Sequence, residues 1–307
     1  MSAKRILICD PIHEDGVEML RKAGFEVDMK LSATECELVK AVSRYDAIIV
    51  RSRTKVTAQI LEAGKRLRVV ARSGVGLDNI DLEAAERRGV EVVNSPEASS
   101  NAVAELALGM MLSLARKIAE ADTSMKRGEW AKDWLTGIEL RGTTLGIIGF
   151  GRIGRALAEK AANLGMRVLT LNRDVDKISR KLKRGDLEAV AFEELLSASD
   201  FVSLHVPLRP ETKNLIGGEQ LRAMKEGAYL INTSRGGIID EEALKVALVN
   251  GKLAGAALDV YEPEPPADTS LTGLANVVCT PHIGASSWES QRANSIIVAE
   301  KLIRILS

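Results

Sequence analysis

Short apolar runs alternate with helical patterns along most of the chain. In the first 97 residues, apolar runs have the length of buried strands at 6–9, 25–29, 47–50, 67–71 and 90–93, and amphipathic patterns at 14–22 and 82–88 lie between them. Later runs of the same kind occur at 145–148, 168–171, 254–258 and 277–280, with strand-to-loop segments at 200–207 and 227–237. This alternation favours parallel sheets with helices on both faces, so it predicts an α/β fold.

A glycine-rich turn follows the run at 145–148. Its pattern is Gly149-x-Gly151-x-x-Gly154, and the helical pattern behind it stops at Gly165, before the next apolar run. In a βαβ unit of this kind the first glycine permits the tight turn, the second lets backbone approach a pyrophosphate, and the third lets helix pack on strand. Free N–H groups at the helix start then face the anion. The segment therefore predicts a dinucleotide-binding Rossmann domain.

Two further helical patterns suggest how the chain is divided. Residues 99–128 read as one long helix, apolar over much of its surface, which we expect to be buried between domains or subunits. A last helix, introduced by a capping box of Ser286 and Glu289, is expected to return to the first domain. The predicted division is a discontinuous substrate domain, 1–97 plus 284–307, and a nucleotide domain, 98–283.

Charge and composition exclude several classes of partner. Lys and Arg number 42, as do Asp and Glu, so the chain has no net charge to attract nucleic acid. The most lipid-like stretch, 106–115, has about half the length of a bilayer span, and no membrane association is expected. The chain start lacks the pattern of a signal peptide, which favours a cytoplasmic protein. Cys9, Cys36 and Cys279 have no metal-site spacing and are expected to be small buried hydrophobes in a reducing compartment.

Polar residues that follow predicted strands are candidates for chemistry. Oxidation of a hydroxy acid needs a cation for the carboxylate and an acid/base for the hydroxyl proton, and Arg235 and His282 suit these roles. Glu264 is a candidate to orient His282 and fix its tautomer. The alternative is that these are structural or loop residues, because spacing alone does not show that they converge. Loops beginning at Arg51 and Arg72 could likewise hold a carboxylate or phosphate, or be solvated loop charges.

Several segments, taken in order, resemble the D-isomer-specific 2-hydroxyacid dehydrogenase family, and within it the D-3-phosphoglycerate dehydrogenase branch. They cover the chain from about 50 to 285, which is more specific than any one motif. Besides the glycine turn, the matching segments are 51–57, 71–81, 103–106, 205–208, 231–237, 258–265 and 280–284.

The resemblance implies a flavodoxin-like substrate domain, a Rossmann domain and roles for individual residues. It implies that Arg235 grips the substrate carboxylate and that Glu264 pairs with His282, the proton donor and acceptor. The implied substrate contacts are Arg51, Ser52, Ser73, Gly74, Val75 and Gly76, with Arg51 a candidate for a distal phosphate. The implied cofactor contacts are Gly149, Gly151, Arg152, Ile153, Gly154, Asn172, Arg173, His205, Val206, Pro207, Thr233, Ser234, Asp259 and Gly284. A homodimer, or a tetramer, is expected, with residues 99–127 as the dimer surface.

One residue departs from the family pattern. Asn172 stands where an NAD enzyme of this fold usually presents an acid to the ribose, and Arg173 could attract a phosphate, so the choice between NAD and NADP stays open. The leading function is oxidation of D-3-phosphoglycerate for serine synthesis. The alternatives are a glyoxylate or hydroxypyruvate reductase and a nucleotide-sensing, corepressor-like interaction protein. Because the chain ends after the returning helix, no regulatory serine-binding domain is expected.

Overall fold

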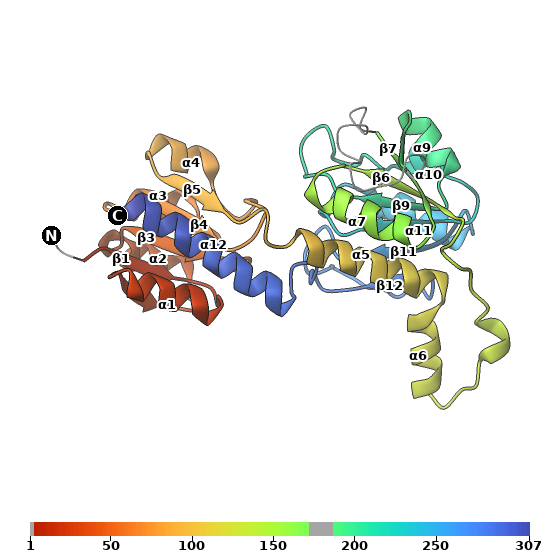
Figure 1. The fold of residues 1–307 in the computed structure, drawn as a ribbon, viewed down its shortest axis with the longest axis horizontal. Helices are drawn as coiled ribbons and strands as arrows, with labels where there is room; N and C mark the ends of the chain where they lie inside the picture. Colours follow the sequence, from red (N-terminus) through yellow and green to blue (C-terminus); the bar gives the residue numbers. More distant parts are fainter. Residues whose placement is uncertain (1–2, 172–186) are drawn as a thin grey trace. The chain divides into compact units, whose positions relative to one another are not determined.

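A computed structural model of the chain describes residues 3–171 and 187–307, so the predicted cofactor contacts Asn172 and Arg173 lie outside the described residues (Figure 1). The chain forms two compact units. Unit 1 comprises Met1–Ser100 and Ala285–Ser307, and unit 2 comprises Asn101–Gly284. Within the described ranges, no helix is both long and apolar enough to cross a membrane.

Unit 1 is built on a five-stranded, all-parallel sheet of order β2-β1-β3-β4-β5, the flavodoxin-like order. Its strands are β1 (Arg5–Ile8), β2 (Glu26–Met29), β3 (Ala47–Val50), β4 (Val69–Arg72) and β5 (Glu91–Asn94). Side chains alternate across the sheet, so Ile6 and Ile8 join one apolar cluster while Leu7 joins the other. The helices that cover the two faces are α1 (Glu14–Lys22), α2 (Glu35–Ala41), α3 (Ala58–Ala63), α4 (Leu82–Arg87) and α12 (Trp288–Leu306).

The last helix, α12, completes the core of unit 1. Val298 and Leu302 are fully buried with Val17 and Leu20 of α1, on the sheet face that carries Ile6 and Ile8. The predicted capping box is wrong by one residue, because the N-cap is Ser287. Its hydroxyl accepts the backbone N–H of Ser290 at 3.1 Å.

Unit 2 contains a seven-stranded parallel sheet of order β12-β11-β10-β9-β6-β7-β8, which is a Rossmann arrangement with one added strand. Its strands are β6 (Thr144–Ile148), β7 (Arg167–Thr170), β8 (Leu187–Ala189), β9 (Phe201–Leu204), β10 (Ala228–Asn232), β11 (Leu253–Leu258) and β12 (Val277–Cys279). One face is covered by α5 (Ser100–Ala115) and α7 (Arg152–Asn163), and the other by α9 (Phe192–Ala198), α10 (Gly218–Ala223) and α11 (Glu241–Val249). The order reverses between β6 and β9, which is where sheets of this type bind ligands.

The long helix predicted at 99–128 is two helices, so that prediction is wrong in its continuity. The segment breaks between α5 and α6 (Ile118–Lys126), where Lys117 adopts a left-handed conformation with φ of 52°. The carbonyl of Ala115 accepts the N–H of Ile138 at 2.8 Å, a long-range contact that ends the helix. Buried residues of α5 pack on the sheet of unit 2 itself, so the apolar breadth of this helix is used within the unit.

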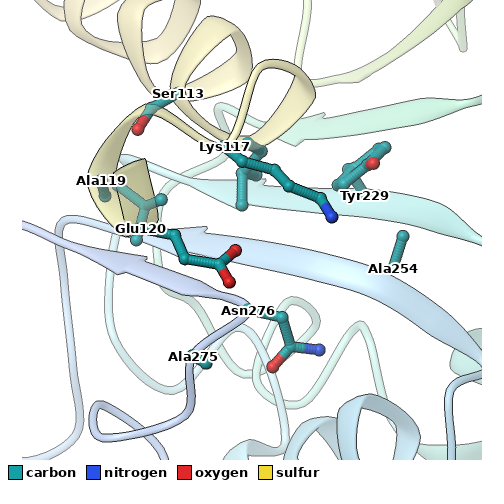
Figure 2. Close-up of a pocket in the computed structure, with 10 residues that line it drawn as sticks. Ser113, Lys117, Ala119, Glu120, Tyr229, Ala254, Ala275 and Asn276 are labelled. Carbon is teal, nitrogen blue, oxygen red and sulfur yellow. The ribbon is translucent and has the colours of Figure 1, made fainter. Parts of the chain in front are cut away.

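A pocket with a mixed polar and apolar lining lies beside this break (Figure 2). It is lined by Lys117, Glu120 and Asn276 together with Tyr229 and Ala254, which lie near the beginnings of β10 and β11. The pocket is therefore at the amino ends of the parallel strands, whereas ligands of such sheets bind at the carboxyl ends. We therefore do not expect the cofactor or the substrate to bind in this pocket.

The cysteine prediction is correct for one residue of three. Cys9 is 1% exposed at the end of β1, and burial raises the pKa of its thiol to about 12. Cys36 and Cys279 are exposed free cysteines, so they do not serve as buried hydrophobes.

Candidate active site

The three glycines after β6 differ in what a side chain at each position would contact. Gly149 has φ of +99°, and a Cβ there would lie 2.4 Å from the carbonyl oxygen of His205. A Cβ on Gly154 would lie 2.3 Å from the carbonyl oxygen of Gly149, so only glycine lets α7 approach the strand end this closely. Gly151, the N-cap of α7, has open space where its side chain would be. The open side of Gly151 and the start of α7 therefore provide a place for an anion.

Two buried polar atoms at the carboxyl ends of β9 and β10 also fit a bound dinucleotide. Within the described residues, Thr233 Oγ1 and His205 Nδ1 are buried without a hydrogen-bond partner. Thr233 follows β10, and His205 follows β9, where its N–H donates to Ile148 at 2.7 Å. Orphaned buried polar atoms are rare in folded proteins, and a ligand that supplies partners accounts for both. The residues present thus fit a nicotinamide dinucleotide.

The remaining predicted cofactor residues lie around the same strand ends. Arg152 and Ile153 open α7 and keep accessible surface, while Val206 and Pro207 continue the loop after His205. Ser234 and Gly284, in contrast, are buried, and their N–H groups and the Ser234 hydroxyl donate hydrogen bonds within the protein. Ser234 donates its N–H and hydroxyl to Asn232 Oδ1, at 3.0 and 2.7 Å, and Gly284 donates its N–H to Asp259.

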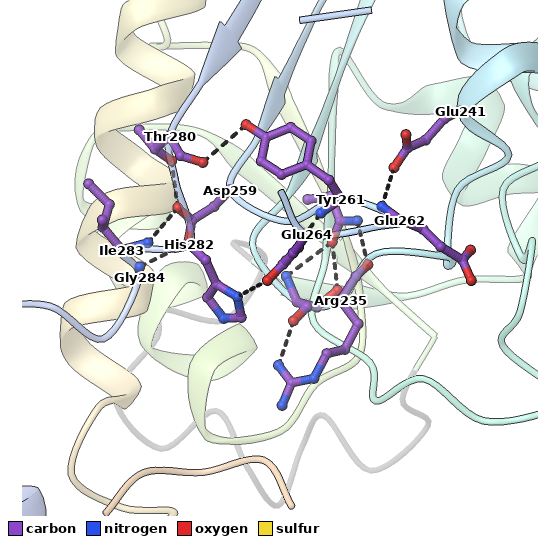
Figure 3. A network of polar contacts seen from close by, with 12 residues as sticks. Arg235, Glu241, Asp259, Tyr261, Glu262, Glu264, Thr280, His282, Ile283 and Gly284 are labelled. Atoms are coloured by element: carbon purple, nitrogen blue, oxygen red, sulfur yellow. Dashed lines mark hydrogen bonds and ion pairs between the residues drawn. The ribbon is translucent and has the colours of Figure 1, made fainter. Parts of the chain in front are cut away.

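Arg235, Glu264 and His282 come together in unit 2 (Figure 3). The Nδ1 atom of His282 lies 2.7 Å from Glu264 Oε2, and the other carboxylate oxygen accepts the N–H of Tyr261 at 3.2 Å. Both side chains of the pair remain accessible, at 47% for His282 and 37% for Glu264. The pair can therefore meet a substrate.

The charge on this carboxylate is stabilised by its neighbours. Burial acts to raise the pKa of Glu264, but the hydrogen bond and charge of His282, the N–H of Tyr261 and the charge of Arg235 outweigh it. The pKa of Glu264 is consequently below its ordinary value, and the carboxylate is ionised at neutral pH. An ionised Glu264 that engages Nδ1 leaves Nε2 of His282 as the nitrogen available for proton exchange.

Residues that the sequence reasoning did not single out hold Arg235 in place. Asn232, 2% exposed, accepts from Ser234 and donates from its Nδ2 to the carbonyl of Arg235 at 2.8 Å. A Cβ on Gly236 would lie 1.9 Å from the carbonyl oxygen of Tyr261, so this glycine brings the Arg235 loop against the Glu264 loop. The position of Asn232 and Gly236 in the sequence could have identified them, because they flank the Thr-Ser-Arg segment at the end of a strand.

In unit 1, the predicted substrate loops are tightly organised. Asp10, 2% exposed, accepts the N–H of Arg51 at 2.6 Å and both the N–H and hydroxyl of Thr54. Burial lowers the pKa of the Arg51 guanidinium, although the charge of Asp10 opposes this. No side-chain hydrogen bond of Arg51 is found within the described part of the chain. Arg51 and Ser73 meet in a small pocket at the carboxyl ends of β1, β3 and β4, with Pro11, Ile12, His13, Gln291 and Asn294 as its other lining residues.

The structure does not bring every predicted substrate residue to this pocket. Ser52 is exposed in the loop after β3, and Gly74, Val75 and Gly76 continue from Ser73 without lining the pocket. Their substrate contacts remain predictions.

Comparison with known proteins identifies the family. Residues 108–284 match the profile described as "D-isomer specific 2-hydroxyacid dehydrogenase, NAD binding domain". The chain belongs to this family. The D-3-phosphoglycerate dehydrogenase of Methanocaldococcus jannaschii is 46% identical over 302 residues, which are 98% of this chain and 57% of that protein. The hydroxypyruvate reductase of Thermotoga maritima is 46% identical over 310 residues, which cover 100% of this chain and 99% of that protein.

A solved structure supports the fold. The TT0316 protein of Thermus thermophilus matches with a TM-score of 0.89 and 38% identity, covering 98% of this chain and 96% of that one. The predicted family, the two parallel-sheet α/β domains and the NAD(P)-binding fold are thus confirmed. The chain spans a little more than half the length of the phosphoglycerate dehydrogenase of Methanocaldococcus jannaschii.

Proposed function

We propose that this protein is an NAD(P)-dependent dehydrogenase of D-2-hydroxy acids and that D-3-phosphoglycerate is its substrate. The observation that supports dehydrogenase activity is the 2.7 Å contact between His282 and Glu264. Arg235 is close enough for its charge to lower the pKa of that glutamate. A cation, a proton carrier and its orienting carboxylate are what oxidation of a hydroxy acid requires.

Each residue then has one task. Arg235 binds the substrate carboxylate through its guanidinium and orients the carbon that reacts. His282 takes the hydroxyl proton at Nε2 during oxidation and returns it during reduction. Glu264 holds the imidazole through Nδ1 and balances the positive charge of the protonated ring. The nicotinamide, when bound, exchanges the hydride with that carbon.

The pocket of unit 1 favours a phosphorylated acid. Arg51 is half-buried and its side chain makes no hydrogen bond in the described part of the chain, and His13 and Ser73 also line the pocket. A guanidinium and a hydroxyl of this kind suit a phosphate group. The relatives named D-3-phosphoglycerate dehydrogenase agree with this proposal. Because another relative is named hydroxypyruvate reductase, unphosphorylated keto acids are the second candidate class of substrate.

A substrate panel separates the two. Hydride transfer is followed at 340 nm with D-3-phosphoglycerate and NAD or NADP, and with hydroxypyruvate or glyoxylate and the reduced cofactors. The proposal expects saturable oxidation of phosphoglycerate, and Arg51→Gln should raise the KM for this substrate while leaving the KM for glyoxylate unchanged. Turnover of the keto acids with no oxidation of phosphoglycerate would favour the second class. The same panel measures cofactor preference, for which Asn172 and Arg173 suggest tolerance of the 2′-phosphate.

We also propose that the protein self-associates through α6 and the segment that follows it in the chain, residues 127–135. Large apolar side chains gather there, with Ile118, Met125, Trp130 and Trp134 exposed at 53%, 56%, 79% and 78%. Figure 1 shows α6 and this segment extending away from the sheet of unit 2. Exposed apolar clusters of this kind mark protein–protein contacts, and a second copy of the chain is the partner we propose.

A further inference from the structure

His13 lies at the start of the first helix of unit 1 and lines the pocket that contains Arg51. It is the N-cap of α1, and its Nδ1 accepts the backbone N–H of Asp15 at 3.2 Å. The Oδ1 atom of the Asp15 carboxylate lies 3.6 Å from Nδ1, which is too far for a hydrogen bond. An imidazole nitrogen that accepts a hydrogen bond carries no proton, so the neutral ring of His13 has its proton on Nε2.

The backbone around His13 is fixed against α12. The carbonyl of His13 accepts the Ser295 hydroxyl at 2.8 Å. A Cβ on Gly16 would lie 2.2 Å from Ser295 Oγ, so the absence of a side chain lets α1 approach α12 this closely. A hydrogen bond from Arg292 to the Asp15 carboxylate joins the same two helices. The position of the imidazole is therefore set by the packing of two helices in the core of unit 1.

Three other polar side chains around the pocket make no hydrogen bond in the described part of the chain. They are Arg51, Ser73 and Gln291, and each can donate. Ser73 is only 4% exposed, so its unsatisfied hydroxyl is unusual for a buried group. No Asp or Glu is among the described residues that line the pocket. An anion with several acceptor oxygens, such as phosphate, satisfies a group of donors of this kind.

From this arrangement we infer that His13 is a specificity-determining residue, which donates from Nε2 to a phosphate held by Arg51 at the distal end of the substrate. The inference rests on the proposed function, because it takes the phosphorylated acid as the substrate. Nδ1 caps α1, and the same hydrogen bond fixes Nε2 as the donor. Acids that lack the phosphate leave the donors of this pocket unsatisfied, and a site built for a polar group rejects analogues without it.

A pair of substrates measures this discrimination. D-3-phosphoglycerate and D-glycerate share the carboxylate and the reacting carbon and differ only in the phosphate. His13→Asn retains an oxygen that can cap α1, but it removes the donor at Nε2. We expect the ratio of kcat/KM for phosphoglycerate to that for glycerate to fall about tenfold or more, as when one hydrogen bond to a charged group is lost. Glu14→Gln, an exposed neighbour in the first turn of α1, is the control and should change this ratio less than about threefold.

Urea unfolding separates capping from binding. His13→Leu loses both the cap and the donor, so its unfolding midpoint should fall, whereas His13→Asn should unfold at the wild-type midpoint. Both variants should nevertheless lower the substrate ratio. A ratio that falls only in His13→Leu, together with the midpoint, would show that His13 is a helix cap alone and would overturn the inference.

Binding of inorganic phosphate tests the site without turnover. The chain has three histidines, so ¹⁵N-histidine spectra of the whole protein can be assigned with one His→Gln variant for each. In mildly alkaline buffer the His13 signals should show a protonated Nε2, and added phosphate should shift the Nε2 signal in the wild type but not in Arg51→Gln. If phosphate shifts this signal while no phosphorylated acid is oxidised, the proposed function fails and the role of His13 stands. Oxidation of phosphoglycerate by a protein whose His13 signals neither phosphate nor phosphoglycerate moves would overturn the inference.

Discussion

His205 shows how burial at a single residue sets a protonation state. Part of the residue is accessible, but its Nδ1 is buried and unpaired within the described residues, and its Nε2 lies 2.9 Å from the hydroxyl of Ser203. Burial lowers the pKa of His205 from 6.5 to about 4. The ring is therefore neutral at physiological pH, and it adds no positive charge beside the glycine turn.

This lowered pKa predicts a pH dependence of stability. Below pH 6.5 the unfolded chain takes up a proton at His205, whereas the folded protein does not until about pH 4. Folding stability should consequently fall as the pH decreases through this window, by at most about 3 kcal/mol. Urea unfolding of the cofactor-free protein at pH 6.5, 5.5 and 4.5 measures the loss. His205→Gln is the control and should lose less stability, and equal losses for both proteins would contradict the account.

At the scale of the elements, the strands were predictable because they are short apolar runs, buried on both faces of parallel sheets. The sequence allowed the loops that contain Arg235, Glu264 and His282 to be located, because each loop follows the end of a predicted strand. The one-residue error at the start of α12 reflects two adjacent serines, either of which can cap the helix. The helix break at Lys117 depends on the contact between Ala115 and Ile138, which no local pattern contains.

The glycine turn allows a matched test at this scale. Gly154→Ala should destabilise the protein by about 1–3 kcal/mol, because the new Cβ meets the Gly149 carbonyl. Gly151→Ala should leave unfolding unchanged within about 0.5 kcal/mol, since no atom lies within 4 Å of the new Cβ. It should nevertheless weaken NADH binding at least tenfold, on the order of 1.4 kcal/mol, because the methyl group occupies the proposed phosphate position. Wild-type NADH affinity in Gly151→Ala would argue against a phosphate at this turn.

At the scale of the whole molecule, the sequence predicted two α/β units from the position of one nucleotide motif and a returning helix. It did not predict which apolar residues would be exposed. The Ala- and Leu-rich face of α5 is covered by the sheet of unit 2, while Trp130 and Trp134 stay exposed in a segment without strong periodicity. Helical periodicity identifies a buried face, but exposure of a loop depends on contacts distant in sequence.

The proposed self-association follows from that exposed segment. Light scattering after size exclusion should give a mass about twice the 33.1 kDa of the chain, or a higher multiple. Replacing both Trp130 and Trp134 with Ser should reduce it to one chain. Trp288→Ser is the matched control, because this tryptophan is 80% exposed but lies in unit 1, at the start of α12. A wild-type protein that stays at 33.1 kDa at micromolar concentration would disprove the proposal.

The most direct test of the central claim is the rate of hydride transfer in a His282→Asn variant, followed by absorbance at 340 nm in a single turnover. Removal of the proton carrier should slow transfer about 10²- to 10⁴-fold, while NADH binding and unfolding stay close to those of the wild type. Glu264→Gln should also slow transfer, and combining the two changes should add little, because the pair acts as one unit. Transfer at the wild-type rate in His282→Asn, with cofactor bound normally, would contradict the assignment of the active site.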